Sequence, residues 1–274
     1  MQKIKLIALD LDDTTLSSDA SLAPETAAAI AGAAKSGVEV VIASGRAFKS
    51  LPCAVMSIDG LRYAISSNGA AIERIADGER IMSFTLRQQS VESILEVFEG
   101  ERFEAFVGGQ PYCDGEYYAE PLRFGCSPAY VEYVKTTRLP VENMPEFIRQ
   151  HIDSLDSIDV LCQTLEHKNE LWEKTKLLPE VYVTSSSPRL IEISDAGAGK
   201  GASLKRLAQL LDIAPEHIAA FGNGDNDADM LAFAGVGIAV ANASEKCLAA
   251  ADHICPSNDD HGVAKTIEKL LALN

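Results

Sequence analysis

Residues 4–16, with the sequence IKLIALDLDDTTL, combine a short apolar run with three closely spaced carboxylates. The apolar part is rich in strand-forming residues and predicts a buried strand. Asp10, Asp12 and Asp13 then follow at the carboxyl end of that strand, where ligands bind in an open α/β sheet. Because like charges at this spacing repel one another, a cation is expected among them. A solvated turn is the alternative interpretation, since Asp and Thr also suit turns and helix caps.

Strand-like and helix-like segments alternate toward both ends of the chain. A helix is predicted at residues 24–36, with Pro near its start and Gly just past its end, and buried strands are predicted at residues 38–43 and 63–66. The same rhythm returns from residue 190 and includes a strand at residues 218–221. Short connections between such elements are typical of a parallel sheet with helices on its faces. The predicted fold class is therefore α/β, with a Rossmann-like parallel-sheet core.

The middle of the chain has a different character. It offers a polar helix candidate at residues 88–98, several short strand candidates and most of the tyrosines. We interpret this part as a separate α+β domain that is inserted into the first one. The expected domains are residues 1–83 for the first part of the core, residues 84–188 for the inserted domain and residues 189–274 for the second part of the core. The strand candidate at residues 190–193 is thereby assigned to the core.

The charge and the cysteine content restrict the partners and the compartment. A formal net charge of -16 on 274 residues argues against polyanionic partners, so neither nucleic acid nor an anionic membrane surface is expected. The six cysteines form no CxxC pair, which favours free thiols in a reducing compartment. Lysines interrupt the first apolar run and no later run approaches membrane-spanning length, so we expect neither a signal peptide nor a transmembrane helix. The expected location is the cytoplasm.

Further groups of polar residues follow predicted strands or precede a predicted helix. These are Ser44, Gly45 and Arg46 after residues 38–43; Ser67 and Asn68 after residues 63–66; Lys200 before a helix; and Asn223, Asp225, Asn226 and Asp227 after residues 218–221. The carboxyl ends of parallel strands meet at one edge of a sheet, so these side chains are expected to lie near Asp10. A Walker A loop does not explain Lys200, because it needs Gly where Ser194 stands and Ser or Thr where Gly201 stands. An EF-hand beginning at Asp10 also fails, because Thr15 stands where Gly is needed.

Together, these residues resemble the motifs of the haloacid dehalogenase superfamily of phosphatases, specifically its Cof-type branch, which carries a large C2-type cap after the second motif. The DxDxT motif of that family matches residues 10–14, Ser/Thr-Gly-Arg matches residues 44–46, SxNGA matches residues 66–70, Lys-Gly matches residues 200–201, and GDxxNDxxML matches residues 222–231 apart from Asn223. The match spans both ends of the chain and is vague only in the expected cap. The resemblance implies that the cap closes over the site and selects the substrate.

The resemblance implies a magnesium-dependent phosphatase that hydrolyses small phosphorylated metabolites, such as sugar phosphates and related monoesters. Asp10 would attack phosphorus and form an aspartyl phosphate. Asp12 would protonate the leaving alcohol and then deprotonate water, while Lys200 would supply a fixed positive charge. The implied phosphate-binding residues are Ser44 with its hydroxyl and backbone N–H, Gly45, Arg46, Asn68, Lys200 and Asn226. The implied Mg2+ ligands are Asp10, Asp12 through its backbone carbonyl, Asn223 and Asp227.

Asn223 departs from the family pattern, because it occupies the place of the fourth motif's first Asp. An amide oxygen still coordinates a hard cation but brings no charge, so Mg2+ affinity is expected to be reduced unless Asp225 or Asp227 compensates. A loop-capping role for Asn223 is the alternative. Two other interpretations of the function stay open. One is a phosphotransferase or phosphomutase, in which an acceptor hydroxyl replaces water, and the other is a regulatory module that binds a phosphorylated ligand with weakened metal chemistry.

Overall fold

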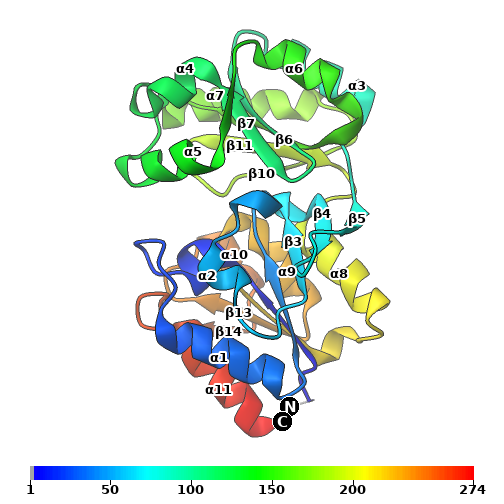
Figure 1. Ribbon diagram of the computed structural model, residues 1–274, viewed down its shortest axis with the longest axis vertical. Coiled ribbons are helices and arrows are strands. Elements are labelled where there is room, and N and C mark those ends of the chain that lie inside the picture. The colour runs from blue at the N-terminus through cyan, green and yellow to red at the C-terminus, as the bar shows by residue number, and fades with distance from the viewer. Residues whose placement is uncertain (1–2) are drawn as a thin grey trace. The chain divides into compact units, whose positions relative to one another are not determined.

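The computed structural model describes residues 3–274, and the chain forms two compact units (Figure 1). Unit 1 comprises Met1–Arg46, Leu51–Met82 and Gly199–Asn274, and unit 2 comprises Ala47–Ser50 and Ser83–Ala198. Unit 2 is therefore inserted into unit 1, and the short segment Ala47–Ser50 belongs to it in advance of the main insertion. No helix within residues 3–274 is long and apolar enough to cross a lipid bilayer.

The core of unit 1 is an eight-stranded sheet with the strand order β14-β13-β12-β1-β2-β3-β4-β5. Its strands are β1 (Leu6–Leu9), β2 (Glu39–Ala43), β3 (Tyr63–Ser66), β4 (Ala71–Arg74), β5 (Arg80–Ser83), β12 (Ile218–Gly222), β13 (Val236–Val240) and β14 (His253–Cys255). The strands from β14 to β3 are parallel, and β4 turns back antiparallel to β3. The predicted parallel core is confirmed, whereas the sequence pattern does not predict β4 and β5.

Helices cover both faces of this sheet. They are α1 (Pro24–Lys35), α2 (Cys53–Met56), α8 (Lys200–Leu210), α9 (Ala228–Phe233), α10 (Glu245–Ala250) and α11 (Gly262–Leu273). On one face, Leu204 of α8 and Met230 of α9 pack in the same cluster as Leu6 and Ala8 of β1. The helix α1 packs along α11, and Figure 1 shows this pair on the other side of the sheet from α8. Because both faces are covered, every residue of β1 is buried, which explains the continuous apolar run in the sequence.

Unit 2 is built on a six-stranded sheet with the order β10-β11-β9-β6-β7-β8. Its strands are β6 (Arg102–Val107), β7 (Gln110–Asp114), β8 (Leu139–Val141), β9 (Leu155–Leu161), β10 (Val181–Thr184) and β11 (Leu190–Asp195). Its helices are α3 (Gln88–Val97), α4 (Gly115–Ala119), α5 (Val131–Thr137), α6 (Met144–Gln150) and α7 (Leu165–Lys174). Neighbouring strands are antiparallel, except for the parallel pair of β7 and β8.

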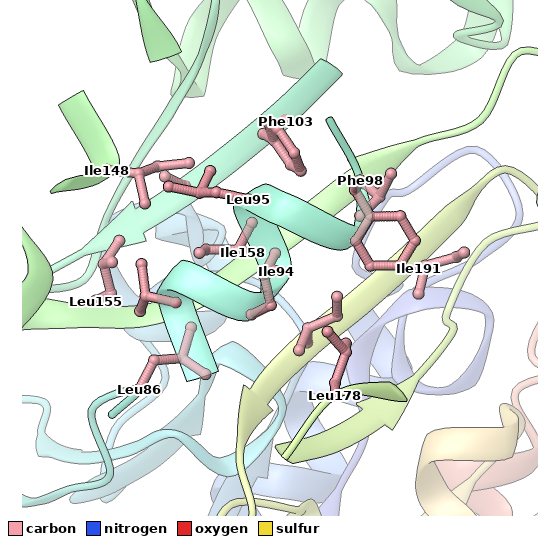
Figure 2. Close-up of a cluster of buried hydrophobic side chains, with 14 of the residues drawn as sticks. Leu86, Ile94, Leu95, Phe98, Phe103, Ile148, Leu155, Ile158, Leu178 and Ile191 are labelled. Carbon is pink, nitrogen blue, oxygen red and sulfur yellow. The ribbon is translucent and has the colours of Figure 1, made fainter. Parts of the chain in front are cut away.

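The two faces of this second sheet carry different clusters of side chains. Ile94 and Leu95 of α3, together with Phe98, pack against Phe103 of β6 and Ile158 of β9 (Figure 2). The opposite face carries a smaller apolar cluster that contains Cys113, Tyr117, Phe124, Val134 and Leu161. Successive side chains of a strand point to opposite faces, so β7 contributes Tyr112 to the first cluster and Cys113 to the second.

The strand β11 belongs to a different sheet from the one predicted. The sequence pattern places residues 190–193 in the core, but β11 pairs with β9 and β10 in the sheet of unit 2. Unit 2 therefore ends at Ala198, whereas the predicted end of the inserted domain is residue 188. Ile191 and Ile193 of β11 pack in the cluster that contains Phe98. The alternation of apolar and polar residues identifies a strand, but it carries no information about which sheet that strand joins.

Candidate active site

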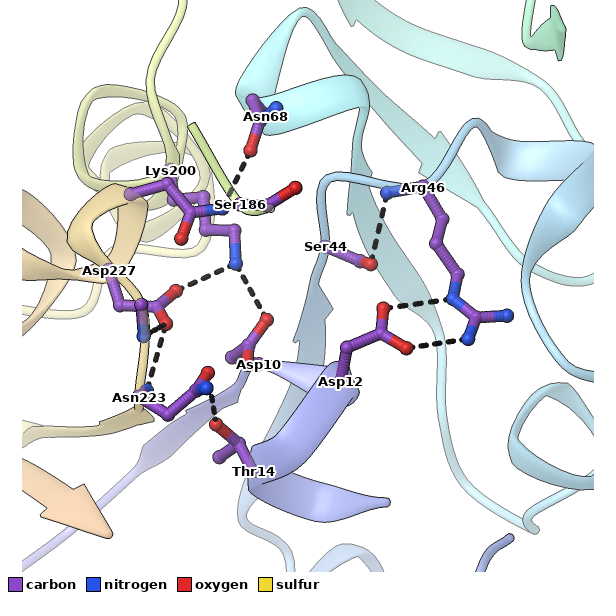
Figure 3. Close-up of polar contacts among 12 residues, drawn as sticks. Asp10, Asp12, Thr14, Ser44, Arg46, Asn68, Ser186, Lys200, Asn223 and Asp227 are labelled. Carbon is purple, nitrogen blue, oxygen red and sulfur yellow. Dashed lines mark hydrogen bonds and ion pairs between the residues drawn. The ribbon is translucent and has the colours of Figure 1, made fainter. Parts of the chain in front are cut away.

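Asp10 stands at the carboxyl end of β1, between β12 and β2 in the sheet of unit 1. Its backbone N–H donates to the carbonyl of Phe221 at 3.1 Å, so Asp10 continues the pairing of β1 with β12. The next residues form a tight turn, η1 (Leu11–Thr15), in which Asp12 is extended and Asp13 has a left-handed φ of +54°. The turn leaves the side chains of Asp10 and Asp12 at the end of the parallel strands (Figure 3).

Lys200 joins Asp10 to Asp227. Its Nζ donates to Asp10 Oδ1 at 2.6 Å and to Asp227 Oδ1 at 2.7 Å (Figure 3). The exposed fractions of Lys200, Asp10 and Asp227 are 1%, 5% and 0%, so water screens these charges little. Lys200 is the first residue of α8. Glycine follows it at Gly201 because a Cβ there would lie 2.6 Å from the backbone of Asp229.

Two carboxylates share one ammonium in this cluster. Burial, followed by the charge of Asp227, raises the pKa of Asp10 to about 7, and the Lys200 ammonium opposes the rise. Burial by itself would lower the pKa of Lys200, but Asp10 and Asp227 outweigh burial and raise that pKa. Lys200 is therefore a fixed cation. The ionised cluster keeps an excess of negative charge, which favours the binding of a further cation.

Asp227 is held inside its own loop. Its Oδ2 accepts from the backbone N–H groups of Asn223 at 2.9 Å and Gly224 at 2.8 Å. A Cβ at Gly222 would lie 2.4 Å from Asp227 Cβ, so the end of β12 requires glycine. With Lys200 on Oδ1, both carboxyl oxygens of Asp227 accept hydrogen bonds. Asp227 thus fixes both the loop and Lys200, a structural role that the sequence pattern does not reveal.

Asn223 turns its side chain toward the η1 turn. Its Oδ1 accepts from Thr14 Oγ1 at 3.0 Å, and Figure 3 shows the amide beside Asp10. Thr14, the threonine of the DxDxT motif, therefore orients Asn223, the residue that departs from the fourth motif. Asn242 makes a second link to the same turn, because its Nδ2 donates to the carbonyl of Asp13 at 2.8 Å. This contact stabilises the left-handed backbone conformation of Asp13.

Ser44 follows β2 and presents its hydroxyl to the site, but not its backbone N–H. The N–H, which the resemblance assigns to the phosphate, instead donates to the carbonyl of Ile65 at 2.9 Å, because the pairing of β2 with β3 continues to this residue. Ser44 Oγ accepts from the backbone N–H of Arg46 at 3.1 Å, with Gly45 between the two. The expected phosphate contact of Ser44 is therefore limited to its hydroxyl.

Arg46 forms a two-pronged ion pair with Asp12. Its Nε donates to Asp12 Oδ2 at 2.9 Å and its Nη2 donates to Asp12 Oδ1 at 2.6 Å (Figure 3). The guanidinium therefore holds both oxygens of the carboxyl group that is expected to act as acid and base. No local pattern in the sequence indicates this pair, because the two residues follow different strands.

Asn68 lies in the short turn η3 (Ser67–Gly69) and has a left-handed φ of +52°. Its Oδ1 accepts from Asn226 Nδ2 at 2.9 Å, so the two amides that are expected at the phosphate bond to each other. Its carbonyl accepts from the backbone N–H of Gly199 at 2.9 Å. A Cβ at Gly69 would lie 2.2 Å from the carbonyl oxygen of Gly199, so this close approach requires glycine. The η3 turn thereby fixes the start of α8.

The oxygen donors around Asp10 suit a hard divalent cation. They are the carboxylate of Asp10 and the amide of Asn223, which lies beside it, and these are ligand types that Mg2+ uses in proteins. Within residues 3–274, no group of three or more His, Cys, Asp or Glu side chains is arranged to hold a metal ion. The oxygen atoms around Asp10 are therefore of the kind that binds Mg2+, and Asp10 is the residue among them that carries a charge.

Comparison with known proteins identifies the family. Residues 7–267 match the family of haloacid dehalogenase-like hydrolases. The chain belongs to this family. The match confirms the family that the motifs predict.

Several relatives of this haloacid dehalogenase-like hydrolase align with it from end to end. It is 31% identical to phosphatase YwpJ of Bacillus subtilis (strain 168), over 98% of this chain and 100% of that protein. It is 27% identical to the 5-amino-6-(5-phospho-D-ribitylamino)uracil phosphatase YwtE of the same organism, over 98% of this chain and 99% of that protein. A solved structure of a haloacid dehalogenase-like hydrolase from B. subtilis superposes with a TM-score of 0.83 at 30% identity, covering 97% of this chain and 99% of that one.

Proposed function

We propose that this hydrolase is a magnesium-dependent phosphatase of small phosphorylated metabolites, such as sugar phosphates and related monoesters. Its family, and the phosphatases to which it is similar, make it a phosphoric monoester hydrolase. The relative that is named as a phosphatase of a phosphoribitylamino-uracil supports a small phosphorylated metabolite as the substrate class. The observation that carries the proposal is the buried Lys200, which lies between Asp10 and Asp227 at the carboxyl ends of parallel strands.

Asp10 is the proposed nucleophile. One of its carboxyl oxygens attacks phosphorus, the bond from phosphorus to the leaving oxygen breaks, and an aspartyl phosphate forms. A phosphate dianion repels a carboxylate, so the attack needs positive charge nearby. Lys200 supplies that charge at 2.6 Å from Asp10 Oδ1, and Asp227 keeps Lys200 in place.

Asp12 is the proposed acid and base. In the first step it gives a proton to the oxygen of the leaving alcohol. In the second step it takes a proton from the water that attacks phosphorus, and the bond from phosphorus to Asp10 breaks to release inorganic phosphate. Its two oxygens are held by Arg46, so the orientation of the carboxyl group is set before a substrate binds.

Mg2+ is the proposed cofactor. Asp10, the backbone carbonyl of Asp12 and the amide of Asn223 would hold it. Asp227 would support the loop instead of binding the ion directly, because its oxygens already accept three hydrogen bonds. When bound, the ion supplies charge neutralisation at the phosphate oxygens. The neutral amide among its ligands is expected to keep the affinity for Mg2+ low.

The proposed phosphate-binding groups surround the end of β1. They are the hydroxyl of Ser44, the backbone of Gly45, the ammonium of Lys200 and the amide of Asn226. Asn68 is proposed to act indirectly, because its Oδ1 holds Asn226 Nδ2 at 2.9 Å.

A phosphate-release assay tests this function. The purified protein is incubated with 4-nitrophenyl phosphate and with a panel of phosphorylated metabolites, with and without Mg2+, and inorganic phosphate is measured. We expect Mg2+-dependent release by the wild type and none by Asp10→Asn. Asp13→Asn is the matched control, because Asp13 is an exposed neighbouring carboxylate and Asn also tolerates its left-handed φ.

Three outcomes would change the proposal. Phosphate release that survives Asp10→Asn would exclude the covalent mechanism. An absence of release with every substrate would favour a regulatory module that binds a phosphorylated ligand. Transfer of the phosphoryl group to an added alcohol, in place of release into solution, would favour a phosphotransferase.

A further inference from the structure

The direction of the Lys200 ammonium group depends on where α8 begins. Its Nζ donates to Asp10 Oδ1 at 2.6 Å and to Asp227 Oδ1 at 2.7 Å, whereas an ammonium group has three N–H bonds. The third N–H bond stays available for a phosphate oxygen. Its direction is set by the other two bonds and by the backbone of Lys200, because the side chain is almost fully buried. The contacts that hold the first turn of α8 therefore set how the phosphate meets this charge.

Two hydrogen bonds tie the first turn of α8 to the η3 turn. The N–H of Gly199, directly before Lys200, donates to the carbonyl of Asn68 at 2.9 Å. The hydroxyl of Ser203 donates to the carbonyl of Gly69 at 2.7 Å, and Ser203 is 0% exposed. The two donors are one helical turn apart and therefore lie on the same side of α8. Lys200 stands between them in the sequence, so both ends of its turn are held.

The η3 turn that accepts these hydrogen bonds has an unusual backbone. All three of its residues have a left-handed φ, of +48°, +52° and +88°, a conformation that is unfavourable for residues with a Cβ. The segment after β2 holds the turn in place, because the N–H of Ser67 donates to the carbonyl of Arg46 at 2.9 Å and the N–H of Asn68 donates to the carbonyl of Ser44 at 3.1 Å. The η3 turn thus joins the segment that carries the Ser44 hydroxyl to the start of α8.

We propose that Ser203 is a positioning residue for Lys200. Its hydrogen bond to Gly69 holds the first turn of α8 against the η3 turn and so directs the third N–H bond of the ammonium group. Ser203 lies outside the motif segments that the sequence reveals, and its hydroxyl acts through Lys200 and not on the substrate. The expected effect on catalysis rests on the proposed phosphatase function, whereas the expected effect on the ion pairs of Lys200 does not depend on any activity.

Ser203 can be changed without disturbing the other contacts that hold the first turn of α8. The N–H of Gly201 donates to Asp229 Oδ2 of α9 at 3.1 Å, and the contact of Gly199 with Asn68 also uses a backbone N–H. Ser203→Ala leaves both of these backbone contacts in place and removes one donor. Any effect of the substitution on the ion pairs of Lys200 therefore comes from the contact with Gly69.

A double-mutant cycle tests whether Ser203 acts through Lys200. The second background is a charge-free variant, in which Lys200→Met is combined with Asp10→Asn and Asp227→Asn. In the wild type Ser203→Ala removes a hydrogen bond and loosens two ion pairs, whereas in the charge-free variant it removes the hydrogen bond alone. We expect the resulting increase in the equilibrium constant of unfolding to be about tenfold larger in the wild type. Urea denaturation in a chelator at about pH 8, above the raised pKa of Asp10, gives both increases. Equal increases would overturn the inference.

The kinetics of Ser203→Ala with 4-nitrophenyl phosphate and Mg2+ give a second test. A misdirected ammonium group stabilises the transition state less, so we expect kcat to fall by about tenfold while KM changes by less than about twofold. Leu207→Val is the matched control, because Leu207 is a fully buried residue one turn further along α8 that packs in the core of unit 1. It should lower stability and keep the wild-type kcat. A wild-type kcat in Ser203→Ala, or an equal loss of kcat in Leu207→Val, would overturn the inference.

The two tests distinguish a failure of this inference from a failure of the proposed function. If the wild type releases no phosphate with Mg2+, the phosphatase function fails, and the double-mutant cycle still decides whether Ser203 positions Lys200. If the wild type is active and Asp10→Asn is inactive, but Ser203→Ala raises the unfolding constant equally in both backgrounds, only the inference fails. Ser203→Cys repeats the cycle should Ser203→Ala not fold, because a thiol fills the space of the hydroxyl and is a weak donor.

Discussion

Lys200 Nζ donates a hydrogen bond to Asp10 Oδ1 at 2.6 Å, and both side chains are almost fully buried. Removing one partner of a buried charge pair leaves the other unpaired and costs about 3–5 kcal/mol. Lys200→Met is therefore expected to lower the free energy of unfolding by about that amount, because Asp10 and Asp227 both lose their cation. It should also abolish phosphate release. Urea denaturation and the Mg2+-dependent assay measure the two effects.

Two further variants show whether the loss of stability comes from the charge of Lys200. Lys205 lies on the exposed side of α8, so Lys205→Met should leave both stability and activity close to the wild type. Combining Lys200→Met with Asp10→Asn and Asp227→Asn removes the unpaired charges, so stability should recover while activity does not. A loss of stability that persists in the combined variant would mean that the lysine acts through its packing and not through its charge.

The stability of the metal-free protein should fall as the pH rises toward neutrality. Burial and the charge of Asp227 raise the pKa of Asp10 from 3.8 to about 7, so between these values the folded protein holds a proton that the unfolded chain releases. The contribution of Asp10 to stability is thus greatest in acid and is lost as the pH rises through about 7. Urea midpoints measured in a chelator should decline over this range more steeply for the wild type than for Asp10→Asn. Parallel curves would contradict the expectation.

Local patterns predict most of the core and the place of the site. The strands β1 and β12 are buried on both faces, so their apolar runs are continuous and readily recognised in the sequence. Parallel pairing then brings their carboxyl ends to one edge of the sheet, which places Asp10 near the loop of Asn223 and Asp227. Each of these inferences needs only a short segment and the direction of the chain.

Local sequence patterns do not predict contacts between distant segments of the chain. Arg46 has 40 acidic residues as candidate partners in the sequence, and only the fold selects Asp12. The membership of β11 in the second sheet depends in the same way on Ile191 meeting the cluster around Phe98. Periodicity and composition report how a segment is buried, whereas these contacts depend on which segments meet.

Asn223→Asp should tighten the binding of Mg2+. Thr14 Oγ1 donates to Asn223 Oδ1 at 3.0 Å and can donate equally to a carboxylate oxygen, so the side chain keeps its place. An added charged ligand is expected to lower the dissociation constant for Mg2+ by about an order of magnitude, because ligand charge tunes the affinity of such sites. Titration of phosphate release against Mg2+ gives the constant for the wild type and the variant. An unchanged constant would show that residue 223 is not a ligand and would leave it a loop-capping role.

A row of three buried carboxyl groups crosses the sheet of unit 2. Asp159 of β9 lies opposite Glu104 of β6 on one side and Glu192 of β11 on the other, and their exposed fractions are 2%, 1% and 4%. Arg138 pairs with Glu104 at 2.9 Å and the Ser186 hydroxyl donates to Glu192 at 2.9 Å. Asp159 Oδ1, in contrast, is buried and has no hydrogen-bond partner among the residues that the structure describes. Burial, followed by the charges of Glu192 and Glu104, raises the pKa of Asp159 against the opposing charge of Arg138.

Asp159→Asn should therefore stabilise the protein at slightly alkaline pH. Asn keeps the shape of the side chain but not its charge, so we expect the free energy of unfolding to rise by about 1–3 kcal/mol at about pH 8. The gain should shrink as the pH falls, because the folded wild type takes up a proton at Asp159 that the unfolded chain does not. Urea denaturation at about pH 5 and about pH 8 measures the difference, with the exposed Asp153→Asn as the control that changes little. A variant less stable than the wild type at the higher pH would contradict this account, because it would mean that the fold stabilises the charged form of Asp159.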